Sequence, residues 1–328
     1  MKFHHLPKVE LHLHLDCSLS YAVASQLDPT LTVAEYQKTF IAPARCTNLA
    51  DFLTRAPSGI RVMQTAEQLR LVVQDLFAQL AQDNVLYAEI RFAPLLHTQR
   101  GLAAPEVVRV VEAAVAASIP ATGIEARVIL CTLRHFTEAQ SLATVQLVEQ
   151  FRGSCVAGFD IAADEAGFPI AAHCPAFLYA REHGIPCTAH AGEARGPESV
   201  WETLQNFFPA RLGHGVRSIE DPALIEHLRR QRIHLEVCPT GNVQIGIYPE
   251  YAAHPVDKLY QAGLSLNINT DARTITNITL NQEYEKLQRT FGWKQEHFFQ
   301  CNHNALQAAF LPEPIKQKLM TRLREGYQ

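Results

Sequence analysis

Apolar runs and amphipathic stretches alternate along nearly the whole chain. The apolar runs have the length and composition of buried strands and lie at residues 9–15, 85–92, 125–133, 156–162, 186–191, 211–215, 234–239 and 264–271. Between them, a helical repeat of apolar positions predicts helices at 66–82, 104–117, 139–151, 170–183, 198–207 and 221–231. Strands that alternate with helices in this way are typical of a parallel sheet.

Eight predicted strands favour a closed α/β fold, the (β/α)8 TIM barrel, over an open doubly wound sheet. No G-x-G-x-x-G motif follows the first strand, so nothing indicates dinucleotide binding. The 328 residues suit one barrel with additions, and no linker or repeat divides them. We therefore expect a single domain over residues 1–328.

Two segments extend the predicted barrel. Residues 17–60 form a long insertion after the first strand, with three prolines and short helical pieces. Because the loops that follow barrel strands build the active-site face, this insertion is either a lid or pocket wall, or packing over the barrel mouth. Residues 295–324 predict two C-terminal helices.

Composition restricts the classes of partner. Hydrophobic residues make up 47% of the chain, the formal net charge is -4, and there is no run of like charges. These values favour a small neutral substrate over nucleic acid or a membrane surface. The eight cysteines form no C-x-x-C pair and the N-terminus has no apolar signal segment, which together predict a cytoplasmic protein.

Four residues of metal-binding types lie in or at the ends of predicted strands. His12 and His14 share one face of the first strand, because alternate residues of a strand point the same way. His190 in CTAHAGE and Asp271 in LSLNINTD each follow another apolar run. Imidazole and carboxylate are good zinc ligands, and a site without cysteine favours a catalytic ion over a structural one. Core or rim histidines satisfied by hydrogen bonds are the alternative interpretation.

Two further titratable residues stand at strand ends on the same predicted face. Glu193 follows His190 by three residues, and His214 lies in RLGHG. If a bound metal activates water, a leaving amine still needs a proton, so Glu193 is a candidate acid and His214 a candidate partner of the attacking water. A carboxylate at a helix N-terminus and a rim histidine beside flexible glycines are the plainer alternatives.

Five blocks of the sequence, in the order VELHLHLD, HAGE, RLGHG, LEVCPTGN and NINTD, resemble the signature blocks of the adenosine deaminase family. The resemblance implies a (β/α)8 barrel that holds one zinc ion. It assigns the metal to His12, His14, His190 and Asp271. It implies further that Glu193 protonates purine N1 and that His214 and Asp271 orient the attacking hydroxide. Asp16 is expected to bind the ribose, and His14 lies beside the substrate as well as the metal.

The sequence also departs from the family pattern. Cys17 and Ala163 replace glycines, Gly241 replaces a serine, and Ala272 replaces a second aspartate that contacts purine N7. A methyl group cannot make that contact, so either recognition at N7 is relaxed or another residue supplies it. We favour a substitute from the polar stretch after Ala272, namely Arg273 or Asn277.

These observations predict a zinc-dependent deaminase of purine salvage that converts adenosine and 2′-deoxyadenosine to the inosine forms and ammonia. The substrate is expected to be a small purine nucleoside, and no feature indicates an oligomeric state. Free adenine, or an adenosine modified at the 5′ position such as aminodeoxyfutalosine, are alternative substrates for the same chemistry. A barrel that binds purines without hydrolysing them is the alternative from another class.

Overall fold

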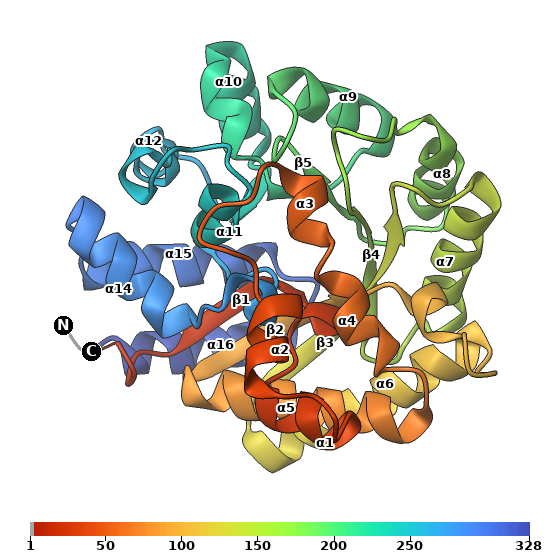
Figure 1. The fold of residues 1–328 in the computed structure, drawn as a ribbon. Helices are drawn as coiled ribbons and strands as arrows, with labels where there is room; N and C mark the ends of the chain where they lie inside the picture. The colour runs from red at the N-terminus through yellow and green to blue at the C-terminus, as the bar shows by residue number, and fades with distance from the viewer. Residues whose placement is uncertain (1–2) are drawn as a thin grey trace.

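A ring of parallel strands surrounded by helices forms the centre of the computed structural model, which describes residues 3–328 (Figure 1). The strands are β1 (Lys8–His14), β2 (Val85–Phe92), β3 (Glu125–Leu133), β4 (Val156–Ala162), β5 (Thr188–Ala191), β6 (Arg211–His214), β7 (His234–Val237) and β8 (Leu266–Ile268). Most residues of these strands are buried on both faces, as expected for strands between a barrel interior and a layer of helices.

The strands pair in two groups of four, in the order β1 to β4 and β5 to β8. Isolated parallel bridges join the groups, one from Phe159 to Cys187 and one from Leu13 to Asp271. Across the second junction, His14 N–H donates to the Asp271 carbonyl at 2.8 Å. The ring is therefore closed, and the predicted (β/α)8 barrel is confirmed.

Helices between the strands cover the outside of the ring, and the six predicted from periodicity are all present. They are α5 (Ala66–Gln82), α6 (Ala104–Thr122), α7 (Glu138–Gln150), α8 (Cys174–Glu182), α9 (Pro197–Phe207) and α10 (Pro222–Gln231). Local sequence defines their starts. At α5, Thr65 accepts from the Gln68 N–H while the Gln68 side chain accepts from the Thr65 N–H, which forms a capping box.

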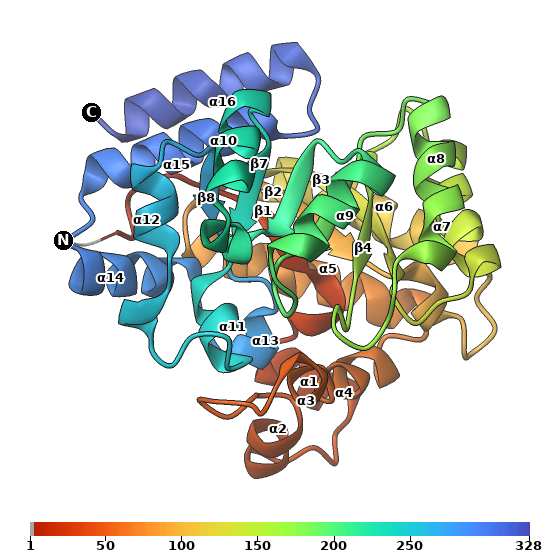
Figure 2. The same cartoon turned by 90° about the horizontal axis from the view of Figure 1, so that it is seen from above.

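The insertion after β1 forms four short helices at one end of the barrel (Figure 2). They are α1 (Tyr21–Leu27), α2 (Val33–Thr39), α3 (Leu49–Leu53) and α4 (Ala56–Arg61). Backbone hydrogen bonds tie this layer to the loops after the last two strands, from Ala42 N–H to Ile275 and from Cys46 N–H to Gln244. The insertion therefore packs over the carboxyl end of the barrel.

The last third of the chain holds helices beyond those that we predicted from periodicity. They are α11 (Pro239–Gln244), α12 (Val256–Gln261), α13 (Arg273–Thr276) and α14 (Leu280–Phe291). The two expected C-terminal helices are α15 (Gln295–Ala308) and α16 (Glu313–Gly326), whose apolar faces pack on β1 and β2. Strand β8 ends at Ile268, before the expected end at residue 271. Within residues 3–328, no helix combines the length and the hydropathy needed to cross a bilayer.

Candidate active site

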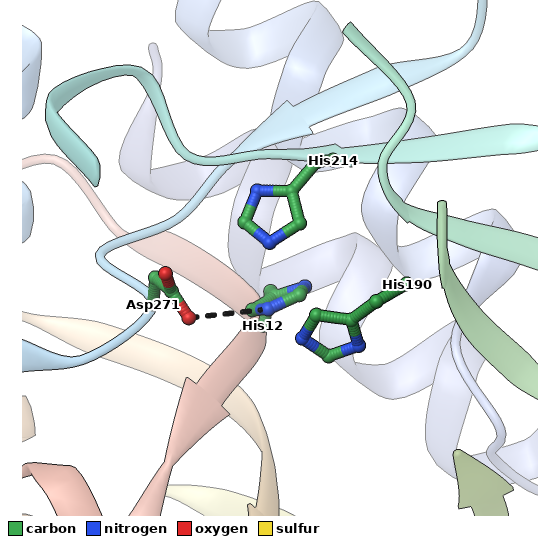
Figure 3. Close-up of side chains that lie close together, drawn as sticks. All are labelled: His12, His190, His214 and Asp271. Atoms are coloured by element: carbon green, nitrogen blue, oxygen red, sulfur yellow. Dashed lines mark ion pairs between the residues drawn. The ribbon is translucent and has the colours of Figure 1, made fainter. Parts of the chain in front are cut away.

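Five side chains from four strand ends converge at the mouth of the barrel. Nitrogen and oxygen ligand atoms of His12, His190, His214 and Asp271 all lie within 4.8 Å of one another (Figure 3). His14 adjoins this group, because its Nε2 lies 3.3 Å from His190 Nε2 and 3.4 Å from Asp271 Oδ1. The structure thus brings together all four predicted metal ligands and also His214.

Carboxylates behind the cluster orient two of its rings. His12 Nδ1 lies 3.0 Å from Glu236 Oε2, and His190 Nδ1 lies 3.1 Å from Asp160 Oδ2. Arg91 donates to both carboxylates, at 2.6 Å to Glu236 and 2.8 Å to Asp160. Since a carboxylate at Nδ1 accepts its hydrogen, Nε2 of each ring presents a lone pair to the cluster.

His12 Nε2 is buried and has no hydrogen-bond partner. It lies 3.3 Å from Asp271 Oδ1, but the geometry is not that of a hydrogen bond. An isolated buried lone pair is unfavourable unless something outside the protein satisfies it. The orphaned atom, the imidazoles of His14 and His190 and the carboxylate of Asp271 match the donor set of a bound divalent metal.

Unusual backbone conformations bring the ligands close. His214 and Asp271 have φ angles of 60° and 65°, a left-handed region that costs free energy for residues other than glycine. At Gly213, a side chain would place its Cβ only 2.9 Å from His12 Cε1. The glycine of RLGHG is therefore required by close packing against the histidine rings.

Glu193 is buried beside this cluster. Burial, with the negative charges of Asp271 and Glu165, raises the pKa of Glu193 well above its ordinary value. The loop that carries Glu193 is fixed by Glu165, whose carboxylate accepts from the backbone N–H groups of residues 192–195. A rigidly held carboxyl with a raised pKa keeps its proton to higher pH than usual, and this suits it to general acid catalysis.

Burial lowers the pKa of His214 well below its usual value, and the neighbouring His12 lowers it further, so the ring is neutral. Its Nε2 faces the cluster (Figure 3) and lies 3.5 Å from Glu193 Oε1. Burial also lowers the pKa of His14, to about 3. Neutral imidazole is the form that binds metals or hydrogen-bonds to a developing anion.

Two connected cavities open from the cluster. The smaller, about 50 Å³, is lined by Glu193, His214 and apolar residues that include Phe52 and Ala272. The larger, about 290 Å³, extends past Asp16 toward α4 and is mostly apolar. Among the described residues no lysine or arginine lines either cavity. Helix α3 of the insertion lines both cavities and α4 lines the larger one, which makes the insertion a pocket wall.

The favoured substitutes for the missing aspartate do not face these cavities. Arg273 donates to Glu10 at 2.6 Å and to Asp83 at 2.8 Å, away from the cluster. Asn277 is exposed and ends α13. Neither residue lines a cavity, whereas Ala272 packs with the apolar side chains of Phe52 and Ile275. The expectation of a substitute donor from these two residues is therefore wrong.

Sequence reasoning missed the residues behind the ligands, namely Arg91, Asp160, Glu165 and Glu236. Arg91, Asp160 and Glu236 are charged residues within mostly apolar strands, in VLYAEIRF, VAGFDIA and HLEV. A lone charge in the middle of a buried strand is costly unless it is paired. Charged residues within several of the predicted strands were the signal that could have revealed this network.

A barrel with this cluster at the carboxyl ends of its strands belongs to the class of barrel hydrolases that use a bound metal. The profile of the adenosine deaminase family matches residues 7–326. An adenosine deaminase from Enterococcus faecalis is 34% identical over 98% of this chain and 97% of its own. The chain therefore belongs to the adenosine deaminase family and is a hydrolytic deaminase.

Two solved structures show the same fold. An adenine deaminase from Arthrobacter aurescens superposes with a TM-score of 0.90 at 24% identity, covering 98% of each chain. An amidohydrolase from Burkholderia ambifaria, solved with bound Zn, has a TM-score of 0.89 at 22% identity and covers 99% of this chain and 91% of its own. At these identities the likeness concerns the barrel and not the substrate.

Proposed function

We propose that this enzyme deaminates adenosine and 2′-deoxyadenosine to inosine and deoxyinosine, with release of ammonia. The observation that carries the proposal is the position of Glu193, a buried carboxyl with a raised pKa that faces the histidine cluster across a small apolar cavity. Such a group can give a proton to an aromatic ring nitrogen at neutral pH. The relatedness to adenosine deaminases supports this substrate class.

The residues at the cluster fit one zinc ion. His12, His14, His190 and Asp271 would hold it, because their ligand atoms converge and His12 Nε2 has no other partner. Zinc accepts imidazole nitrogen and carboxylate oxygen, and the Burkholderia relative was solved with that metal. When bound in such a site, zinc supplies hydroxide at neutral pH by lowering the pKa of water.

The side chains of this chain have separate tasks in the reaction. Glu193 donates its proton to purine N1, which makes C6 more electrophilic. The hydroxyl that has added to C6 then gives its proton to the amine, which leaves as ammonia as the C6 carbonyl forms. His214 Nε2 contacts the oxygen that adds to C6. Asp271 orients the attacking water, since several histidines hold its pKa well below the usual value although burial alone would raise it.

The larger cavity favours a nucleoside over the other substrates. It leaves room for a ribose beside Asp16, whereas free adenine would leave about 290 Å³ unfilled. The pKa of Asp16 is lowered, because the His97 side chain outweighs the effect of burial, so the carboxylate is ionised. Without a lysine or arginine in the described lining, an ionised carboxylate disfavours a 5′-phosphate but can accept from ribose hydroxyls.

Two further properties belong to this proposal. Residues 1–328 act as one domain, because both the insertion and the C-terminal helices pack on the barrel. The enzyme works in the cytoplasm, which is supported by eight free cysteines of which most are buried.

The test is turnover of adenosine, deoxyadenosine, adenine, AMP and a 5′-modified adenosine, followed as ammonia release, with zinc content determined on the same sample. Adenosine and deoxyadenosine should have the highest kcat/KM. Glu193→Gln should keep its zinc and lose about 10²–10⁴-fold in kcat, the range of general acid catalysis. A preference for adenine, or no ammonia from any substrate, would refute the proposed function.

A further inference from the structure

A chain of buried side chains runs away from the active site behind His214. His214 ends β6, Asn242 lies in α11, and His254 precedes α12. Asn242 Nδ2 lies 3.2 Å from His214 Nδ1, and Asn242 Oδ1 lies 3.2 Å from His254 Nε2. All three side chains are buried. None of these contacts involves a carboxylate, in contrast to the contacts behind His12 and His190.

The hydrogen bond at His254, the residue of this side-chain network farthest from the active site, has a fixed direction. The backbone N–H of Val256 lies 3.1 Å from His254 Nδ1. A backbone N–H can only donate, so His254 Nδ1 must accept through a lone pair. Burial lowers the pKa of His254 to about 3, and the ring is therefore neutral. The one ring hydrogen of His254 must then be on Nε2.

This hydrogen fixes the orientation of the next group. His254 Nε2–H donates to Asn242 Oδ1, so the Asn242 amide cannot be turned the other way without facing two donors toward each other. With Oδ1 fixed, the Nδ2 group of Asn242 donates to His214 Nδ1. His214 Nδ1 is thus an acceptor, and the hydrogen of the neutral ring lies on Nε2.

The ring hydrogen of His214 is therefore on the opposite nitrogen from that of the metal-ligand histidines His12 and His190. There, Glu236 and Asp160 accept at Nδ1, and Nε2 presents a lone pair. The Nε2 atom of His214 faces the cluster (Figure 3) and lies 3.5 Å from Glu193 Oε1. By the hydrogen-bond directions above, this atom carries a hydrogen instead of a lone pair. A nitrogen in this state cannot bind a metal or take up a proton, but it can donate a hydrogen bond.

We propose that Asn242 and His254 are positioning residues that hold His214 as an Nε2–H donor to the oxygen that adds to C6. His214 is then neither a metal ligand nor a proton acceptor in the deaminase reaction, although it lies among the ligand atoms. The proposal rests on the proposed function for the identity of that oxygen. The hydrogen-bond directions themselves do not depend on any substrate.

The first experiment reads the tautomer directly. Two-bond ¹H–¹⁵N spectra of the zinc-loaded enzyme, with His214 assigned by its loss in His214→Asn, distinguish a ring nitrogen that bears hydrogen from one that does not. We expect His214 to carry hydrogen on Nε2 only. A spectrum with hydrogen on Nδ1, or with zinc bound at Nε2, would overturn the proposal. Because this measurement needs no turnover, it stands apart from any failure of the deaminase assay.

The second experiment reverses the polarity of the chain. Asn242→Asp is nearly isosteric but offers only acceptors, so the hydrogen of His214 should move to Nδ1. Loss of one preorganised donor to a developing oxyanion costs about 10²–10³-fold in kcat, and a wrong histidine tautomer costs about 10⁴-fold in serine proteases. We expect kcat to fall by about 10²-fold or more, with zinc content and KM nearly unchanged.

A matched pair at His254 separates polarity from packing. In His254→Gln, the side-chain carbonyl accepts from Val256 N–H and the amide donates to Asn242, so the direction of the chain and most of the activity should survive. His254→Leu keeps the apolar bulk but removes both bonds, and kcat should fall with zinc retained. Equal kcat in the two variants, or zinc lost in parallel with activity in Asn242→Asp, would contradict the positioning role. The pair also provides the test if Asn242→Asp does not fold.

Discussion

Two networks of buried charge lie within the barrel, and they differ in what they leave open. The ligand-supporting network, Arg91, Asp160, Arg211 and Glu236, lies behind the histidines. The seam network, Lys8, Glu10, Asp83 and Arg273, joins β1 to the segment after β8. Both pair arginine with carboxylate, and both are nearly inaccessible to solvent.

The difference lies in the atoms that remain without a partner. In the ligand-supporting network the hydrogen bonds end at His12, whose Nε2 lone pair is free to bind a cation. Each network also leaves one arginine Nε–H unpaired, at Arg91 and at Arg273, and an N–H cannot bind a metal. The seam network contains no unpaired lone pair like that of His12 Nε2. Lys8 donates to three backbone carbonyls. In this barrel, a network of buried charges belongs to a functional site only where it leaves a lone pair, such as that of His12 Nε2, without a partner.

The largest expected effect is a loss of stability on disrupting the seam network. Arg273→Ala leaves the carboxylates of Glu10 and Asp83 buried without their cation, so we expect a loss of about 3–5 kcal/mol in the free energy of unfolding. Urea denaturation of the zinc-loaded enzyme measures this loss. The control is Arg229→Ala, which breaks an exposed pair with Glu226 and should cost less than about 1 kcal/mol. Similar losses in both variants would mean that the seam network is not a stability device.

The next effect concerns the ligand-supporting network. Asp160→Asn cannot accept from both Arg91 and His190, so His190 should lose its fixed orientation. Residues that orient metal ligands contribute about 10–100-fold to metal affinity, and we expect that loss in a zinc competition titration. Glu10→Gln, in the seam network, is the control and should bind zinc as tightly as wild type. A weaker zinc affinity in Glu10→Gln would remove the distinction between the networks.

The neutral chain behind His214 should respond to acid. The pKa of His254 is lowered from 6.5 to about 3, so between these values the unfolded state binds a proton that the folded state does not. Stability should therefore fall as the pH decreases below 6.5, by about 2 kcal/mol at pH 5 from this residue. In His254→Gln, the number of protons taken up on unfolding between about pH 3 and 6.5 should be smaller by about one. An unchanged slope would show that His254 is protonated in the folded protein.

The smallest expected effect is the difference in kcat/KM between adenosine and its analogue without N7. Ala272, Phe52 and Ile275 form an apolar wall, and Arg273 is held in the seam network. A neutral hydrogen bond at N7 would be worth about 0.5–1.5 kcal/mol, or roughly 2- to 13-fold. Without one, kcat/KM for adenosine and 7-deazaadenosine should agree within about 2-fold. A larger preference for adenosine would require an unidentified donor in the cavity.

The sequence was sufficient for the barrel and for the residues that converge in it. Because parallel strands in a closed ring end at one rim, His12, His14, His190 and Asp271 could be placed together from their positions at strand ends. Helices α11, α12 and α13 escaped because they have six, six and four residues, too few to repeat an apolar pattern. Helix α14 has 12 residues, a clear apolar face and a capping box at Thr279, so the sequence did carry a signal for it. Backbone hydrogen bonds with the insertion, which is remote in sequence, hold α11 and α13.

Side-chain direction was the part that strand and helix patterns could not supply. Arg273 follows a residue that lines the cavity, but one step along a helix turns the side chain by roughly 100°, which carries it into the seam. In the same way, Asn242 and His254 lie in segments without a repeating pattern. Their contact with His214 depends on how the end of β6, helix α11 and the segment before α12 pack against each other.

The bridge between Leu13 and Asp271 has a consequence for how the enzyme is made. It joins the first strand of the ring to the segment after the last, and the candidate ligands lie on both sides of that junction. During synthesis from the N-terminus, His12 and His14 emerge early, but Asp271 leaves the ribosome only when the barrel is almost complete. The nascent chain therefore cannot assemble the full ligand set until the segment after β8 has joined β1 and closed the ring.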